Sequence, residues 1–119
     1  MAQQELIVDY INAYNRFDIP GMLACLSPDV RFEHYERHAL QLCVNGKHEF
    51  EQVARLSSSL FSSREQRILA LQSLENEVRV ELSFTGQLAQ QPEAAPLKLQ
   101  GSSEFRFKEG LISEIRDYC

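Results

Sequence analysis

The sequence predicts an α+β fold in which three helices towards the N-terminus cover one face of a mostly antiparallel sheet. In the first part of the chain, apolar residues recur every three or four positions, which is typical of amphipathic helices. In the second half they alternate with polar residues, which is typical of strands with one buried face. Because the strands of the second half follow one another without intervening helices, the order favours an α+β fold over an alternating α/β fold.

Two helices are predicted before the first strand. The first runs from residue 3 to about residue 16 and presents one apolar stripe. Asp18 is a good N-cap for a short second helix, in which Pro20 is tolerated in the first turn. This helix ends near residue 26, because the residue before Pro28 disfavours the helical region. The stripe of the first helix is formed by Leu6, Ile7, Tyr10, Ile11, Tyr14 and Phe17.

The stretch DVRFEHYERH, residues 29–38, predicts a strand whose apolar face ends in a histidine. Alternation places Val30, Phe32 and His34 on one face. A second strand over residues 39–44 ends at the Asn-Gly turn signal of residues 45 and 46. From residue 48 to about residue 62 the apolar spacing is again helical.

The remainder of the chain predicts four long antiparallel strands. Clear polar stretches separate them, among them the proline-bearing loop of residues 89–96. With only three helices to cover such a sheet, a pocket is expected in its concave face. The expected strands span residues 67–74, 77–88, 97–107 and 111–118.

Length and composition limit the class of protein. At 119 residues the chain is expected to form a single domain, residues 1–119. A net charge of −5 without a lysine or arginine cluster argues against nucleic acid as a partner. The chain has neither an apolar run long enough for a bilayer nor the pattern of a signal peptide, so no membrane association is expected. Three cysteines in such a chain predict reduced thiols and a cytoplasmic location.

Three stretches together resemble the nuclear transport factor 2-like superfamily. They are YINAYNRFDIPGMLACLSPDVRFEH, VNGKHEF and EFRFKEGLISEIRDY, and within the superfamily they look most like the SnoaL-like and ketosteroid-isomerase-like branch. The resemblance implies a cone-shaped fold, a curved mixed sheet around a pocket, often dimerised through the sheet. The superfamily includes isomerases, cyclases, dehydratases, epoxide hydrolases and binding modules, so the resemblance leaves the function open.

The resemblance also assigns candidate site residues. Ketosteroid isomerases place a tyrosine on the first helix, a carboxylate that acts as the general base at the end of the first strand, and a second acid on a later strand. By motif these positions correspond to Tyr10, His34 and Ser103. Because a serine hydroxyl is a weaker donor than a buried carboxylic acid, steroid isomerisation is not carried over. His34 remains a suitable general base near neutral pH.

Asp117 is the expected partner of His34. Period-two alternation puts Asp117 on one face with Ser113, Ile115 and Cys119, and the resemblance turns that face into the cavity. A dyad would then fix the histidine tautomer. The alternatives are a solvated His34 at a strand end and an Asp117 paired with a charged surface neighbour.

Further residues are expected to form the cavity wall, and two functions remain open. The first is a cofactor-free and metal-free proton-transfer enzyme acting on a small hydrophobic or carbonyl-bearing ligand. The second is a non-catalytic module that binds a ligand or another chain. A homodimer through the outer sheet face is also expected, with a mixed rather than apolar interface. The predicted wall residues are Tyr14, Phe32, Ser103, Phe105 and Phe107.

Overall fold

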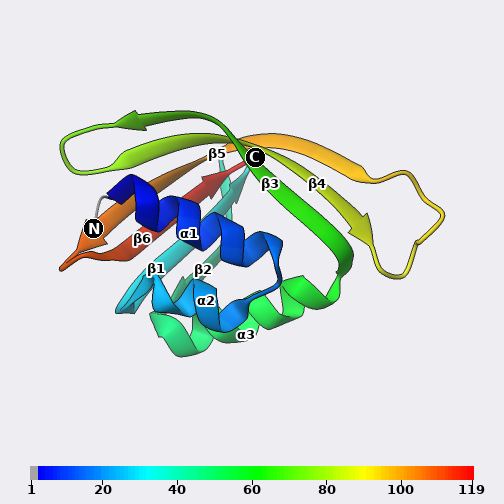
Figure 1. The fold of residues 1–119 in the computed structure, drawn as a ribbon, viewed down its shortest axis with the longest axis horizontal. Helices are drawn as coiled ribbons and strands as arrows, with labels where there is room; N and C mark the ends of the chain where they lie inside the picture. Colours follow the sequence, from blue (N-terminus) through cyan, green and yellow to red (C-terminus); the bar gives the residue numbers. More distant parts are fainter. Residues whose placement is uncertain (1–2) are drawn as a thin grey trace.

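The computed structural model describes residues 3–119 and confirms the predicted order of helices and strands (Figure 1). Two helices come first, a strand pair and a third helix follow, and four long strands end the chain. The helices are α1 (Gln3–Asn15), α2 (Ile19–Ala24) and α3 (Gly46–Ser59). The strands are β1 (Leu26–Glu36), β2 (Ala39–Asn45), β3 (Phe61–Ser73), β4 (Val78–Leu88), β5 (Leu97–Lys108) and β6 (Leu111–Tyr118).

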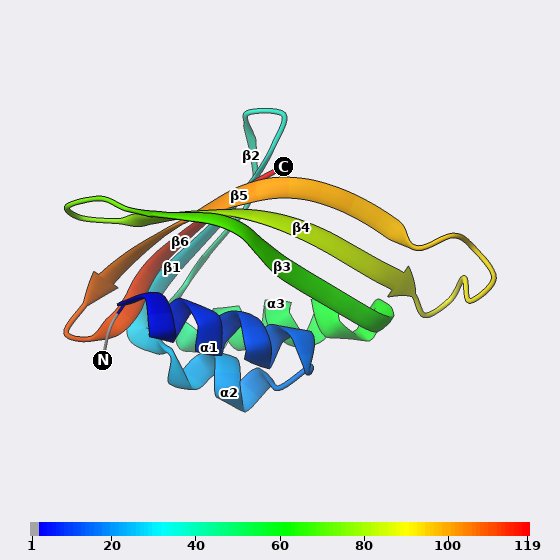
Figure 2. The same cartoon turned by 45° about the horizontal axis from the view of Figure 1, so that its top comes forward.

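The strands form one six-stranded mixed sheet in the order β2-β1-β6-β5-β4-β3. Every neighbouring pair is antiparallel except β1 and β6, which run parallel at the centre. Figure 2 shows the sheet curving over the three helices, with the β4–β5 end extending beyond α3. The α+β fold with helices on a curved mixed sheet is therefore confirmed.

The core lies between the concave face of the sheet and the stripe of α1. It is built by the alternation seen in the sequence, because Val78 and Val80 of β4 and Ile115 of β6 are almost completely buried. On α1, Ile7 is fully buried against them. Asp18 caps α2 as expected, since its carboxylate accepts the amide hydrogen of Gly21 at 3.0 Å.

Two strands begin earlier than the sequence indicates. β3 begins at Phe61, directly after α3, because its first residues pair with the far end of β4, where Phe61 lies opposite Leu88. β1 begins at Leu26, where its pairing with β6 is irregular up to Arg31. Both extensions depend on pairing with strands distant in the sequence, which local periodicity does not report.

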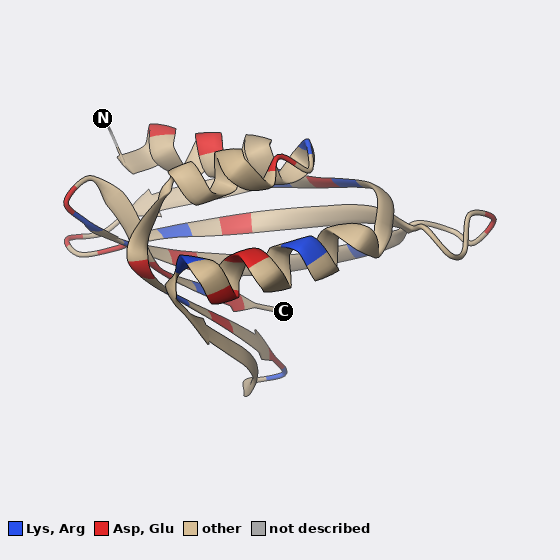
Figure 3. Cartoon of the chain, turned by 90° about the horizontal axis from the view of Figure 1, so that it is seen from below, with Lys and Arg blue, Asp and Glu red and all other residues tan. Residues whose placement is uncertain are grey.

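Charged residues are dispersed over the surface. In the view of Figure 3, residues of both signs follow one another along α3 and the strands. Among residues 3–119, no helix has the length and apolar character needed to cross a membrane.

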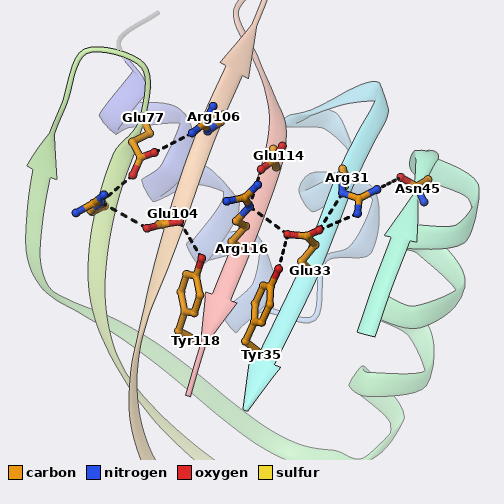
Figure 4. Close-up of polar contacts among 11 residues, drawn as sticks. Arg31, Glu33, Tyr35, Asn45, Glu77, Glu104, Arg106, Glu114, Arg116 and Tyr118 are labelled. Atoms are coloured by element: carbon orange, nitrogen blue, oxygen red, sulfur yellow. Dashed lines mark hydrogen bonds and ion pairs between the residues drawn. The ribbon is translucent and has the colours of Figure 1, made fainter. Parts of the chain in front are cut away.

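The convex face of the sheet carries a row of paired charges, which we call the charge ladder (Figure 4). Its best-buried member is Glu33, whose side chain is 7% exposed and pairs with Arg31 at 2.8 Å and Arg116 at 3.1 Å. The Tyr35 hydroxyl also donates to Glu33, at 3.0 Å. The ladder consists of four glutamates and four arginines: Glu33, Glu77, Glu104, Glu114, Arg31, Arg79, Arg106 and Arg116.

Candidate active site

A cavity of about 490 Å³ opens between the concave face of the sheet and the helices. Its wall is mostly apolar and aromatic, with contributions from α1, α2, α3 and all six strands. The polar groups within it are few, a combination typical of small-molecule sites. The aromatic wall includes Tyr10, Tyr14, Phe32, Phe50, Phe61, Phe84 and Phe105.

His34 lies on the cavity wall near the end of β1. The alternation that buries Val30 and turns Phe32 inward continues to the histidine, as the sequence predicts. Its side chain is 26% exposed, so the ring is accessible from the cavity. Its Nε2 lies 3.3 Å from Oε1 of Glu36, which lies two residues further along the same face and also lines the cavity.

Asp117 lines the cavity from β6 and is partly buried. Ser103, directly opposite on β5, donates its hydroxyl hydrogen to Oδ1 of Asp117 at 2.5 Å. Burial raises the pKa of the Asp117 carboxyl, and the Ser103 hydrogen bond and the nearby His34 only partly oppose this. Asp117 therefore takes up a proton more readily than an exposed aspartate does.

The structure replaces the expected hydrogen bond between His34 and Asp117 with two others. The residues occupy paired positions on the parallel strands β1 and β6, so they are neighbours, as expected. The short carboxylate of Asp117, however, binds the serine on its other flanking strand, while the histidine ring binds along its own strand. Each group thus takes a partner that the sequence analysis did not assign to it.

Tyr10 extends from α1 to the cavity wall, near Asp117. Its side chain is 7% exposed and its ring packs against Phe50 and Phe105, at centroid distances of 6.5 and 6.0 Å. Within residues 3–119 its hydroxyl has no hydrogen-bond partner. Burial raises the pKa of the Tyr10 hydroxyl well above its ordinary value, and the Asp117 charge adds to the effect. Tyr10 is therefore a neutral donor facing the cavity.

Tyr14, one helical turn along α1, also lines the cavity and is held by a residue that the sequence analysis missed. The guanidinium of Arg64 lies 3.7 Å from the centre of the Tyr14 ring, and its Nε donates to the Tyr14 carbonyl at 2.9 Å. Arg64 is 6% exposed and does not line the cavity. Arg64 was missed because the sequence predicts the strand only from residue 67, whereas β3 begins at Phe61. The inward direction of Arg64 could therefore not be inferred from strand alternation.

The other predicted wall residues divide into two groups. Phe32, Ser103 and Phe105 line the cavity together with Tyr14, as expected. Phe107 does not, because it lies near the other end of β5, where it borders a small hollow with Leu6 at the start of α1. The alternation along β5 was predicted correctly, but β5 is longer than the cavity. Only part of the inner face of β5 therefore lines the cavity.

The described residues offer no metal centre. No group of three or more histidine, cysteine, aspartate or glutamate side chains comes together in residues 3–119 in a way that would hold an ion. The groups on the cavity wall that are suited to proton transfer and hydrogen bonding are the imidazole of His34, the carboxyl of Asp117 and the hydroxyl of Tyr10.

The sequence profile of the SnoaL-like domain matches residues 7–115, nearly the whole chain. The chain belongs to the SnoaL-like domain family. The match extends from α1 to β6 and so includes Tyr10, His34 and Ser103 of the cavity. A comparison with curated proteins finds no match.

Solved structures similar to this SnoaL-like chain share its fold at low identity. A protein from Catenulispora acidiphila with a ketosteroid isomerase-like fold, in complex with trimethylamine, aligns with a TM-score of 0.85 and 13% identity, over 99% of this chain and 87% of its own. A nuclear transport factor 2-like protein of unknown function from Burkholderia pseudomallei gives 0.83 and 20%, over 98% and 90%. An epoxide hydrolase from M. tuberculosis gives 0.77 and 18%, over 96% and 79%.

Proposed function

We propose that this SnoaL-like protein is an enzyme that moves a proton on a small apolar, carbonyl-bearing ligand. One observation carries the proposal: His34, Asp117 and Tyr10, three groups suited to proton transfer and hydrogen bonding, line a single cavity whose walls are otherwise largely apolar. A mainly aromatic wall supports an apolar ligand, and the few polar groups orient it.

The proposed reaction uses the side chains of this chain alone. The neutral imidazole of His34 removes a proton from the carbon next to the carbonyl, and the electron pair of that C–H bond moves to the carbonyl oxygen to form an enolate. Tyr10 and the protonated form of Asp117 donate hydrogen bonds to this oxygen. Protonated His34 then returns the proton to a carbon of the enolate, which regenerates the carbonyl.

Each supporting residue has a proposed role. Ser103 holds Asp117 in position through the 2.5 Å hydrogen bond, and Glu36 holds the His34 ring. Tyr14, Phe32 and Phe105 contact the ligand. The trimethylamine complex and the epoxide hydrolase among the similar structures support a small molecule as the ligand.

The test is exchange of ligand protons with solvent, which requires no knowledge of the natural substrate. The protein is mixed with apolar ketones such as cyclohexanone and 2-tetralone in D₂O, and loss of the protons next to the carbonyl is followed by NMR. We expect faster exchange with the wild-type protein. In His34→Ala the rate falls about 100-fold or more, while ketone affinity stays within about twofold.

His48→Ala is the matched control, because His48 is an exposed histidine of α3 outside the cavity lining. It leaves the exchange rate unchanged. Exchange that survives His34→Ala contradicts the role of His34. Ketone binding without any exchange contradicts catalysis and favours the second candidate, a module that binds a ligand in the same cavity.

We also propose two properties of the protein outside the cavity. The charge ladder supports a homodimer formed by two convex faces, because its four glutamates and four arginines leave it with no net charge. The three free cysteines, Cys25, Cys43 and Cys119, support a cytoplasmic location. Recovery of the tagged protein in a membrane or exported fraction contradicts that location.

A further inference from the structure

The charged side chains on the cavity wall are acidic rather than basic. Two carboxyl groups, Glu36 and Asp117, line it, whereas none of the lining residues within 3–119 is a lysine or an arginine. The nearby cation, Arg64, lies behind the Tyr14 ring and donates to the Tyr14 carbonyl. A ligand carboxylate or phosphate would thus meet acidic groups and find no basic side chain other than His34.

The rest of the wall suits a positive charge. Phe32 and Phe50 pack edge to face at 5.7 Å, and Phe61 and Phe84 do so at 5.4 Å, so several rings gather around one space. The face of an aromatic ring is negative and attracts ammonium groups, most strongly where water is excluded. The wall therefore offers a cation two acidic side chains, Glu36 and Asp117, and the negative faces of several aromatic rings.

An unpartnered hydroxyl on a largely buried side chain, that of Tyr10, lines this cavity. The Tyr10 side chain is 7% exposed, and its hydroxyl has no hydrogen-bond partner in residues 3–119. Buried hydroxyls are normally satisfied by protein, water or ligand. The Tyr10 hydroxyl lies near Asp117, whose charge acts on it, so a ligand group could contact both.

We propose that the cavity selects an apolar ligand that carries a protonated amine or quaternary ammonium group, and that it rejects carboxylates and phosphates. The proposal deepens the proposed function, because it assigns a charge to the ligand of the same cavity. An apolar amino ketone would fit both the proposed function and the charge preference. Its carbonyl would lie at Tyr10 and its ammonium group beside a carboxylate.

The physical basis is the cost of burying charge. A cation that enters beside Asp117 favours the ionised carboxylate and forms a charge-assisted pair in a region screened from water. An anion loses its hydration and gains no such pair, so its transfer is unfavourable. The net charge of −5 on the chain also raises the local concentration of cations relative to anions.

The test compares three ligands of one shape and different charge: benzylamine, benzyl alcohol and benzoate. Each is titrated into the full chain and followed by NMR shifts of the cavity residues, at about pH 8, where an ordinary imidazole is neutral and benzylamine is mainly an ammonium ion. We expect benzylamine to bind about tenfold more tightly than benzyl alcohol, and benzoate to bind more weakly than both.

Three variants locate the source of this preference. Asp117→Asn and Glu36→Gln remove the two cavity charges with little change of shape, and together they reduce the preference for benzylamine over benzyl alcohol to about twofold or less. Glu81→Gln also replaces one glutamate by glutamine, as Glu36→Gln does, but at an exposed position of β4 away from the cavity, and it leaves the preference intact.

The proposal is overturned if benzoate binds as well as benzylamine, if benzylamine does not bind, or if the preference persists in the double variant. Its failure can be told from failure of the proposed function, because His34→Ala removes no negative charge. Loss of ketone exchange with an intact preference for the ammonium ligand supports both proposals. A preference for the ammonium ligand in a wild-type protein that catalyses no exchange supports the charge selection alone.

Discussion

His34 and Asp117 occupy paired positions on parallel strands, yet each side chain takes its hydrogen-bond partner from elsewhere. Their shared direction was predictable, because strand alternation sets the face of each residue and the family resemblance turned both faces into the cavity. Their partners were not predictable, since Ser103 reaches Asp117 through the β5–β6 register and Glu36 was not recognised as part of the site. Register is a property of the folded sheet, and a single sequence reports it only indirectly.

The raised pKa of Asp117 gives a prediction at this scale. The folded protein binds the Asp117 proton more tightly than the unfolded chain does, so it holds more protons between the ordinary and the raised pKa. The contribution of Asp117 to stability is therefore fully present below the ordinary pKa and is lost as pH rises through the raised one.

In Asp117→Asn this loss is absent, so the free energy of unfolding of the variant should rise relative to that of the wild-type protein as pH increases from about 4. Urea unfolding at a series of pH values measures the difference, and each unit of pKa shift corresponds to about 1.4 kcal/mol. A difference that is independent of pH would contradict the raised pKa. Comparing variant with wild type cancels the contributions of the other carboxylates.

At the scale of elements, β5 extends past the end of β6, and Gly101 lies where the two part. A Cβ at Gly101 would come within 2.3 Å of the backbone oxygen of Tyr118, closer than real Cβ atoms approach. The backbone there cannot move without disturbing β6, which carries Asp117 one residue earlier.

We predict that Gly101→Ala lowers the free energy of unfolding by about 1–3 kcal/mol, the usual cost of forcing extra volume into a packed region. Ser102→Ala is the control on the same strand, because it removes a hydroxyl without a hydrogen-bond partner in residues 3–119, and its effect should stay within about 0.5 kcal/mol. Urea unfolding measures both. Equal stability of the two variants would contradict the prediction, because it would show that the end of β6 moves aside for the added Cβ at little cost.

The element order was predictable because apolar spacing depends on local geometry alone, and the curvature of the sheet was implied by the family resemblance. The early start of β3 was not, since Phe61 joins the sheet by pairing with Leu88. That shift also concealed Arg64, whose inward direction follows only once the strand is known to begin before it. The cavity itself was anticipated from the small number of helices, but the exclusion of Phe107 depends on where along β5 the cavity ends.

At the scale of the whole molecule, the concave and convex faces of the sheet are chemically distinct. The concave face is apolar apart from the cavity groups, while the convex face carries the charge ladder (Figure 4). Paired charges at an interface contribute more to specificity than to affinity, so a dimer through this face should be of moderate strength. In such a dimer, the charge ladder of one protomer would pack against the charge ladder of the other about a two-fold axis.

We predict a dimer at micromolar concentration, measured by light scattering coupled to size-exclusion chromatography. Arg106→Glu removes one of the two arginine partners of Glu77 and gives the ladder a net charge of −2, so two copies repel and the protein becomes monomeric. Arg55→Glu makes the same change in charge on α3, where Arg55 pairs with Glu51 of its own helix, and it leaves the dimer intact. A wild-type monomer would contradict the proposed dimer. A dimer that tolerates Arg106→Glu would indicate a different interface, because a ladder that carries two uncompensated negative charges cannot approach its own copy without cost.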